Sequence, residues 1–197
     1  MTKPDPLADG DFVIGPDYTP APEGLPLAGV PTGKVHAFVM ESRDSRIYPG
    51  IKRVKNEATR RRDAFGNRIA AAEHVQSVAA AYTRAVWVYV PAQYLPGTAA
   101  PFIVAQDGYP YLNRLPRVLD NLIAAGRIPP LIAIMVDSGG GDAQGSQRGL
   151  EYDTLSGRYS DFIETEVLPR VAAETGVTLT DDPDGRATMG VSSGAGA

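Results

Sequence analysis

The sequence predicts an α/β fold with a mainly parallel sheet. Residues 86–90 read Val-Trp-Val-Tyr-Val, and this alternation has the two-residue period of a β-strand. Two short apolar runs, 101–105 and 131–136, lack alternation, as expected for strands buried on both faces. Apolar side chains recur at helical spacing over 115–123 and 159–171. Strands and helices that alternate across short connections predict right-handed crossovers within one sheet.

Two more strands complete the expected sheet. We expect the first strand of the chain at 34–41 and the last at 186–190. Gly126 is expected to end the first helix and Gly176 the second, because glycine readily takes the left-handed conformation that closes helices. Pro169 lies inside the second helix, where its missing N–H predicts a kink.

The chain divides into an arm and a domain. Residues 1–34 are rich in proline, which removes hydrogen-bond donors and fixes φ, so we expect an extended arm. Residues 35–197 are expected to belong to one α/β domain. Residues 52–84 are expected to form a surface excursion from it, with a short helix in the Ala-rich stretch that carries His74. The arginines near its start indicate a solvated face.

The composition excludes several classes of protein. The chain has 197 residues, 43% of them hydrophobic and 21% charged, which is typical of a globular protein. The net charge of -4 argues against a nucleic-acid partner. Without cysteine there is no disulfide, no thiolate nucleophile and no Cys-ligated zinc, and two histidines, His36 and His74, do not make a His-rich metal site. We expect no metal and no organic cofactor.

No segment predicts export or membrane insertion. The first six residues, Met-Thr-Lys-Pro-Asp-Pro, lack the apolar stretch of a signal peptide. No run approaches the roughly 18 apolar residues of a membrane span. We therefore expect a cytoplasmic protein without a membrane partner, whereas a mis-assigned start codon would allow a periplasmic or secreted one.

The segment Gly-Val-Ser-Ser-Gly at 190–194 is a G-x-S-x-G motif directly after a predicted strand. In this motif a sharp turn from strand to helix holds the central serine in a strained conformation, so the flanking residues must be small. The turn exposes the hydroxyl of Ser192, and the N-terminus of a following helix supplies a positive field. Ser192 is the candidate nucleophile, and an ordinary Gly/Ser loop is the alternative.

A second candidate site segment, Gln-Asp-Gly-Tyr at 106–109, follows the strand predicted at 101–105. Acyl transfer needs two backbone N–H groups directed at the developing oxyanion. One comes from the residue after the nucleophile, here Ser193, and the other from the loop after an early strand. Tyr109 is the best candidate for the second donor, although Asp-Gly alone indicates only a turn.

Two other segments carry weaker signals. Residues 137–145 include three consecutive glycines, but their spacing departs from the dinucleotide fingerprint and no helix opens directly after them. We interpret this segment as a rim loop of the active site, with phosphate binding as the alternative. The acidic run at 181–185 lacks the alternating ligands and distal glutamate of a calcium loop, and it indicates a tight turn.

Together these segments resemble the esterase D and enterochelin-esterase-like branch of the α/β-hydrolases. In that family a VYVPA-type strand, an LDG-type loop, a helix ending in E-x-L-P and the serine motif occur in this order. The leader at 14–18 is also similar to the start of bacterial members, some described as gluconolactonases. The segments that carry the resemblance are 86–92, 103–108, 148–153, 162–169 and 190–194.

The resemblance implies a three-layer sandwich that hydrolyses a small-molecule carboxylic ester. Ser192 would attack the acyl carbon, the N–H groups of Tyr109 and Ser193 would bind the oxyanion, and a histidine oriented by an acid would move the proton. In the family that acid and histidine follow the serine, whereas only five residues follow Ser192 and both His36 and His74 precede it. We therefore expect an N-terminal portion of a longer hydrolase, with the C-terminal part missing and little activity alone. The alternative is a non-catalytic α/β ligand-binding or interaction module.

Overall fold

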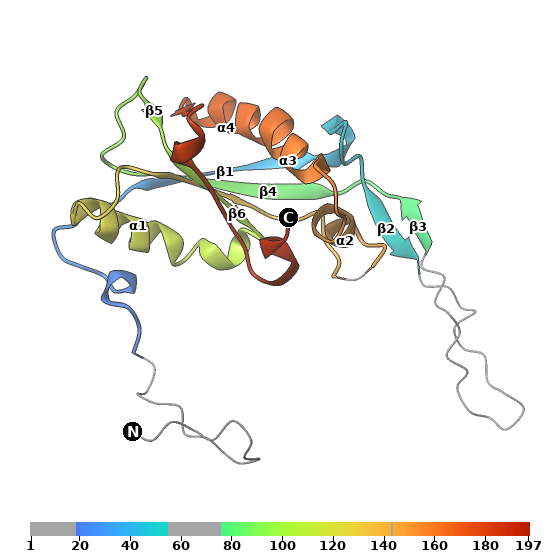
Figure 1. Ribbon diagram of the computed structural model, residues 1–197, viewed down its shortest axis with the longest axis horizontal. Coiled ribbons are helices and arrows are strands. Elements are labelled where there is room, and N and C mark those ends of the chain that lie inside the picture. Colours follow the sequence, from blue (N-terminus) through green and yellow to red (C-terminus); the bar gives the residue numbers. More distant parts are fainter. Residues whose placement is uncertain (1–18, 55–75, 143) are drawn as a thin grey trace, which may run out of the picture.

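A mixed five-stranded sheet lies at the centre of the molecule. The computed structural model describes residues 19–54, 76–142 and 144–197 (Figure 1). Across the sheet the strand order is β1-β4-β7-β6-β9. These strands are β1 (Lys34–Glu41), β4 (Thr83–Val90), β7 (Ile132–Val136), β6 (Phe102–Gln106) and β9 (Arg186–Met189). Every strand predicted from the sequence is therefore present, close to its predicted bounds.

Four of these five strands run in the same direction. β4 pairs antiparallel with both β1 and β7, whereas β6 pairs parallel with both β7 and β9. β4 is thus the strand of this sheet that opposes the others, and the mainly parallel sheet is confirmed. The carboxyl ends of β7, β6 and β9 meet at one edge, which is where open α/β sheets place their sites.

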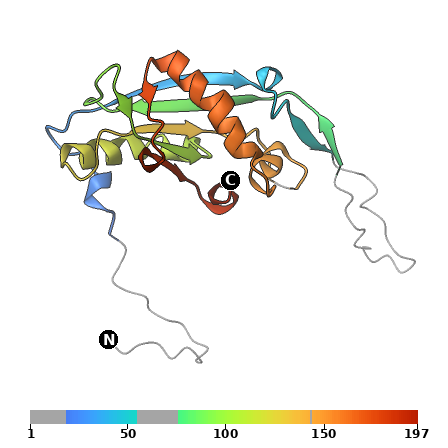
Figure 2. The same ribbon diagram turned by 45° about the horizontal axis from the view of Figure 1, so that its top comes forward.

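Helices cover both faces of the sheet and give the predicted three-layer sandwich (Figure 2). One face is covered by α1 (Leu115–Ala124). The other is covered by α3 (Arg158–Phe162), a π-helical turn (Ile163–Val167) and α4 (Leu168–Thr175). Within the described ranges no helix is both long enough and apolar enough to cross a membrane.

The central strand β7 shows why its sequence lacks alternation. Ile132, Ile134 and Val136 belong to the core beneath α3 and α4. Ala133 and Met135 belong to the core beneath α1. All five side chains are fully buried, and each fully buried aliphatic side chain contributes about 1.5–3 kcal/mol to folding. A charged residue on either face of β7 would therefore be placed in a core.

Glycine closes the long helices as expected. Gly126 follows α1 at φ 65° and Gly176 follows α4 at φ 72°, both in the left-handed region. Pro169 lies in the first turn of α4, directly after the π-helical turn. The irregularity predicted at Pro169 thus lies in the preceding turn, where the hydrogen-bond pattern widens to π-helical before the proline, which has no N–H to donate.

Part of the prediction for residues 52–84 is wrong. β2 (Ile51–Val54) and β3 (Gln76–Ala79) form an antiparallel ribbon, and neither strand was predicted. The short helix predicted around His74 stays a prediction. The last two residues of this stretch, Thr83 and Arg84, belong to the central strand β4. Residues 55–75, with His74, lie outside the described residues. Elsewhere β5 (Ala99–Ala100) pairs parallel with β8 (Thr178–Leu179).

The described part of the predicted arm lies along α1. Residues 22–24 form a 3-10 turn, and Asn121 Nδ2 donates to the carbonyls of Glu23 (2.7 Å) and Leu25 (2.9 Å). The N–H of Gly33 donates to Asp120 Oδ1 at 2.9 Å, and the same oxygen accepts the hydroxyl of Tyr89 at 2.6 Å. Buried polar groups of α1 thus hold this stretch by its backbone. Residues 1–18 lie outside the described residues.

A buried ion pair joins β4 to α2 (Gln147–Tyr152). Arg84 Nη2 lies 2.6 Å from Glu151 Oε1, and the two side chains are 2% and 0% exposed. The carboxylate also accepts hydrogen bonds from Tyr82, Gln147 and the N–H of Gly139. Burial works to lower the pKa of Arg84, but the Glu151 carboxylate raises it by more, so the arginine stays charged.

Candidate active site

The predicted serine motif forms a tight turn after β9, which we term the Ser192 turn (residues 190–194). Val191 is extended and Ser192 then takes φ 57°, a left-handed conformation that is costly for residues other than glycine. The N–H of Gly194 donates to the carbonyl of Val191 at 3.1 Å. A Cβ on Gly190 would lie 2.1 Å from the carbonyl oxygen of Gly194, so that position requires glycine. Ser192 is exposed and opens a single 3-10 turn, Ser192–Ala195.

The loop after β6, residues 106–109, lies against this turn. β6 and β9 are parallel neighbours with Ala105 opposite Met189, so their carboxyl ends lie side by side. Gly194 is buried, and a Cβ there would lie 3.3 Å from Asp107 Oδ2. Two non-glycine residues of the described chain have a positive φ: one is Ser192 and the other is Asp107, at 55°. The structure thus brings the loop of Tyr109 into contact with the turn of Ser192 and Ser193.

The backbone N–H groups of residues 107–109 all have acceptors inside the protein. In chain order these acceptors are the Tyr152 hydroxyl (3.2 Å), the Val136 carbonyl (3.1 Å) and Asp137 Oδ1 (3.0 Å). The first belongs to a buried side chain and the second to the end of β7. The acceptor of the Tyr109 N–H is a partly exposed side chain, which can rotate away most easily of the three.

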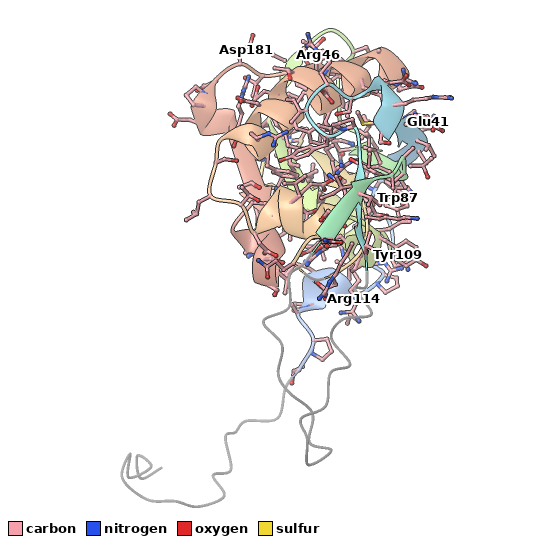
Figure 3. The ribbon with its side chains drawn as sticks, turned by 90° about the vertical axis from the view of Figure 1, so that its right-hand side faces the viewer. Glu41, Arg46, Trp87, Tyr109, Arg114 and Asp181 are labelled. Atoms are coloured by element: carbon pink, nitrogen blue, oxygen red, sulfur yellow. The ribbon has the colours of Figure 1, made fainter. Side chains whose placement is uncertain are left out.

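Asp137 was expected only as the start of a rim loop. Burial raises the pKa of the Asp137 carboxyl and the nearby Asp107 carboxylate adds to the rise, whereas the Tyr109 N–H and Arg84 oppose it. The Tyr109 side chain is 63% exposed, and its ring centroid lies 6.0 Å from that of Trp87 (Figure 3). Two interactions of Tyr109 therefore hold the loop: its backbone N–H donates to Asp137, and its ring packs against Trp87.

The glycines of 137–145 pack against α2. A Cβ on Gly139 would lie 2.0 Å from Gln147 Cγ, and one on Gly141 would lie 2.6 Å from Ser146 Cβ. Ser146 caps α2 by accepting the N–H of Gly149 at 3.1 Å. Close packing thus accounts for these two glycines without a bound phosphate.

Arg148 of α2 reaches the 106–109 loop, a contact that no sequence motif indicates. Its Nη2 lies 2.7 Å from Asp107 Oδ2, and its Nε donates to both carboxylate oxygens. Its Nη1 lies 2.7 Å from Asp142. The guanidinium carbon lies 5.1 Å from the ring centroid of Tyr152. Hydrogen bonding to Asp107 raises the pKa of Arg148, so the guanidinium stays charged.

Comparison with known proteins identifies the family. A family described as "Putative esterase" matches residues 77–197, which is more than half of the chain. The chain belongs to this esterase family. The match includes the 106–109 loop, α2 and the Ser192 turn. It confirms the predicted resemblance to an esterase branch of the α/β-hydrolases. No curated protein matches the chain.

The chain also matches solved esterase structures. A ferulic acid esterase matches with a TM-score of 0.50 at 17% identity, over 83% of this chain and 50% of that one. A feruloyl esterase module from Clostridium thermocellum matches with a TM-score of 0.46 at 17% identity, over 91% and 50%. The enterobactin esterase of Shigella flexneri matches with a TM-score of 0.45 at 21% identity, over 57% and 28%. The chain thus spans half or less of each esterase.

The described part of the chain places no histidine beside Ser192. His36 is exposed on β1, which lies at the opposite edge of the sheet from β9. His74 lies outside the described residues. No group of three His, Asp or Glu side chains in the described ranges is arranged to hold a metal ion. The acidic run forms the expected tight turn, in which Asp182 accepts the N–H of Asp184 and Asp181 pairs with Arg186.

Proposed function

We propose that this esterase-family protein hydrolyses a carboxylic ester of a small molecule, with Ser192 as nucleophile. The observation that carries the proposal is the exposed Ser192 at φ 57°, in a turn where a Cβ on Gly190 would lie 2.1 Å from a backbone oxygen. Strain of this kind is held only where the surrounding structure determines it, and it is common at catalytic positions.

The reaction has two half-steps. Ser192 Oγ attacks the acyl carbon while a base removes its proton, and the carbonyl oxygen becomes an oxyanion. When the intermediate collapses, the alcohol leaves with a proton and the acyl group stays on Ser192. Water then attacks the acyl-enzyme, and the acid product and the free serine form. Because His36 lies on the far edge of the sheet, we assign the base to a group outside the described residues.

The N–H groups of Ser193 and Tyr109 are the proposed oxyanion donors. The N–H of Ser193 belongs to the Ser192 turn itself. The N–H of Tyr109 must first leave Asp137 Oδ1, which it meets at 3.0 Å. Rotation of this partly exposed side chain frees the N–H of Tyr109. The substrate oxyanion then accepts that hydrogen bond in place of Asp137. Loss of one oxyanion donor typically lowers kcat by about 10²–10³-fold.

A fluorophosphonate probe tests the nucleophile. Applied to the natural-length protein, it should label the wild type and leave Ser192→Ala unlabelled. Ser160→Ala is the matched control, because Ser160 is an exposed serine on α3, and it should be labelled like the wild type. A folded wild-type protein that resists the probe would contradict the proposal and favour the non-catalytic module.

A further inference from the structure

We propose that Arg148 is a positioning residue for the esterase reaction, acting through Asp107 to hold the 106–109 loop at the Ser192 turn. The inference rests on the proposed function of Ser192. It concerns two side chains, Arg148 and Asp107, that are 41 residues apart in the sequence.

Asp107 is the contact between the loop and the turn. Its Oδ2 is the atom nearest to a Cβ built on Gly194, at 3.3 Å, so the carboxylate packs against the backbone of the turn. Its own backbone is left-handed at φ 55°, a conformation that costs an aspartate about 1 kcal/mol. Asp107 therefore needs external bonds to stay in this position.

Those bonds come from α2. The carboxylate receives three hydrogen bonds from Arg148, at 3.1, 3.2 and 2.7 Å, and the N–H of Asp107 donates to the Tyr152 hydroxyl. The Arg148 side chain is 14% exposed and lies over the ring of Tyr152. The same ring is within 3.8 Å of a Cβ built on Gly194. Arg148, Asp107 and Tyr152 thus form one cluster, which we call the α2 clamp, that fixes both strained segments.

The clamp depends on the fork shape of arginine. Nε and Nη2 bind the carboxylate from two directions and set its orientation as well as its distance. A lysine at 148 would keep the charge but offer a single ammonium group, so the carboxylate could turn. Displacement of a reacting group by about 1 Å costs on the order of 10²-fold in rate. The α2 clamp should therefore affect kcat more than substrate affinity.

The second ion pair of Arg148 provides a matched control. Asp142 also lies 2.7 Å from the guanidinium, but its side chain is 89% exposed. Exposed pairs of this kind are worth about 0–1 kcal/mol. Asp142→Asn therefore removes a charge partner of the same arginine without changing the contact to the Ser192 turn.

The experiment uses the natural-length protein and four variants: Arg148→Lys, Asp107→Asn, their double variant and Asp142→Asn. Each is assayed with a fluorophosphonate probe and with p-nitrophenyl acetate, and its thermal unfolding is recorded. We expect Arg148→Lys and Asp107→Asn each to lower kcat by about 10–10²-fold with KM changed less than about 2-fold. The double variant should lose no more than the worse single variant, since both act through one contact. Asp142→Asn should match the wild type.

The outcomes separate the two proposals. If the wild type is labelled but Arg148→Lys keeps its kcat, or if the losses of the two single variants multiply, the positioning role is overturned and the esterase stands. If the folded wild type is not labelled, both are overturned. Should Arg148→Lys and Asp107→Asn not fold, Tyr152→Phe removes only the hydroxyl that accepts the Asp107 N–H. A wild-type kcat in that variant would also count against the clamp.

Discussion

Glu151→Gln should destabilise the protein strongly, because it removes the charge partner of Arg84 in a dry environment. Arg84 and Glu151 are 2% exposed or less. The Glu151 oxygens accept two hydrogen bonds from Arg84, at 2.6 and 3.1 Å, and others from Tyr82, Gln147 and Gly139. Glutamine keeps the shape, but it replaces one acceptor by an NH₂ group that faces donors. The guanidinium then stays buried without a counter-charge.

The expected cost is large for a single substitution. Removing one member of a buried ion pair costs about 3–5 kcal/mol, which for a domain of this size lowers Tm by roughly 6–20 °C. Urea unfolding followed by circular dichroism measures the free energy directly. Glu174→Gln is the control, since the Arg170–Glu174 pair is 52% and 37% exposed and is worth about 0.3–0.5 kcal/mol.

A double variant tests the cause. Arg84→Met combined with Glu151→Gln removes the charge on both sides, so its cost should be smaller than the sum of the single costs by about 0.5–3 kcal/mol. If Glu151→Gln costs less than about 1 kcal/mol, or if the two substitutions are additive, the ion pair does not hold β4 to α2 as we argue.

Three further predictions concern the sheet edge that carries the site. Gly190→Ala should lower the free energy of unfolding by about 1–3 kcal/mol, because its Cβ would lie 2.1 Å from a backbone oxygen; Gly157→Ala, where nothing lies within 4 Å, should stay within about 0.5 kcal/mol of the wild type. Ser192→Gly should be more stable than Ser192→Ala by about 0.5–1 kcal/mol in urea unfolding, since glycine relieves the left-handed strain but adds unfolded-state entropy, and equal stabilities would refute the strain. The pKa of Asp137 is raised by burial above 3.8, so its contribution is present below that pH and lost as the pH rises through the folded pKa. Asp137→Asn should therefore gain stability relative to the wild type as the pH rises above 3.8, and a stability difference that is constant with pH would contradict this.

The fold was predictable where the information is local. Buried strands such as β7 read as apolar runs because both faces are covered, and the helices end at Gly126 and Gly176 because those positions need φ above zero. The strand at 76–79 was not predictable in the same way. Its four residues, Gln-Ser-Val-Ala, show no clear strand pattern, and its pairing partner β2 is not its neighbour in the sequence.

In the candidate site, too, some features can be predicted from local sequence and others cannot. Ser192 is recognisable because its motif fits within five residues, and Tyr109 because a loop after an early strand has a defined place. The Asp107–Arg148 pair spans 41 residues and the Tyr109–Asp137 bond spans 28. These contacts depend on the order of the strands in the folded sheet, which local sequence does not reveal. The available signal was weak: a charged residue directly after a buried strand, and an arginine in a segment that carries the family resemblance.

The pairing of β6 with β9 has a consequence for synthesis of the chain. Gln106 and Thr188, which join the two strands by a hydrogen bond, are 82 residues apart. At about 5–20 residues per second, β9 leaves the ribosome roughly 4–16 s after β6. During that interval the edge of β6 that later pairs with β9 presents unpaired backbone N–H and C=O groups, and it is a site for wrong pairing or for a chaperone. The Ser192 turn follows β9 directly, so its left-handed backbone is fixed only after β9 has paired with β6.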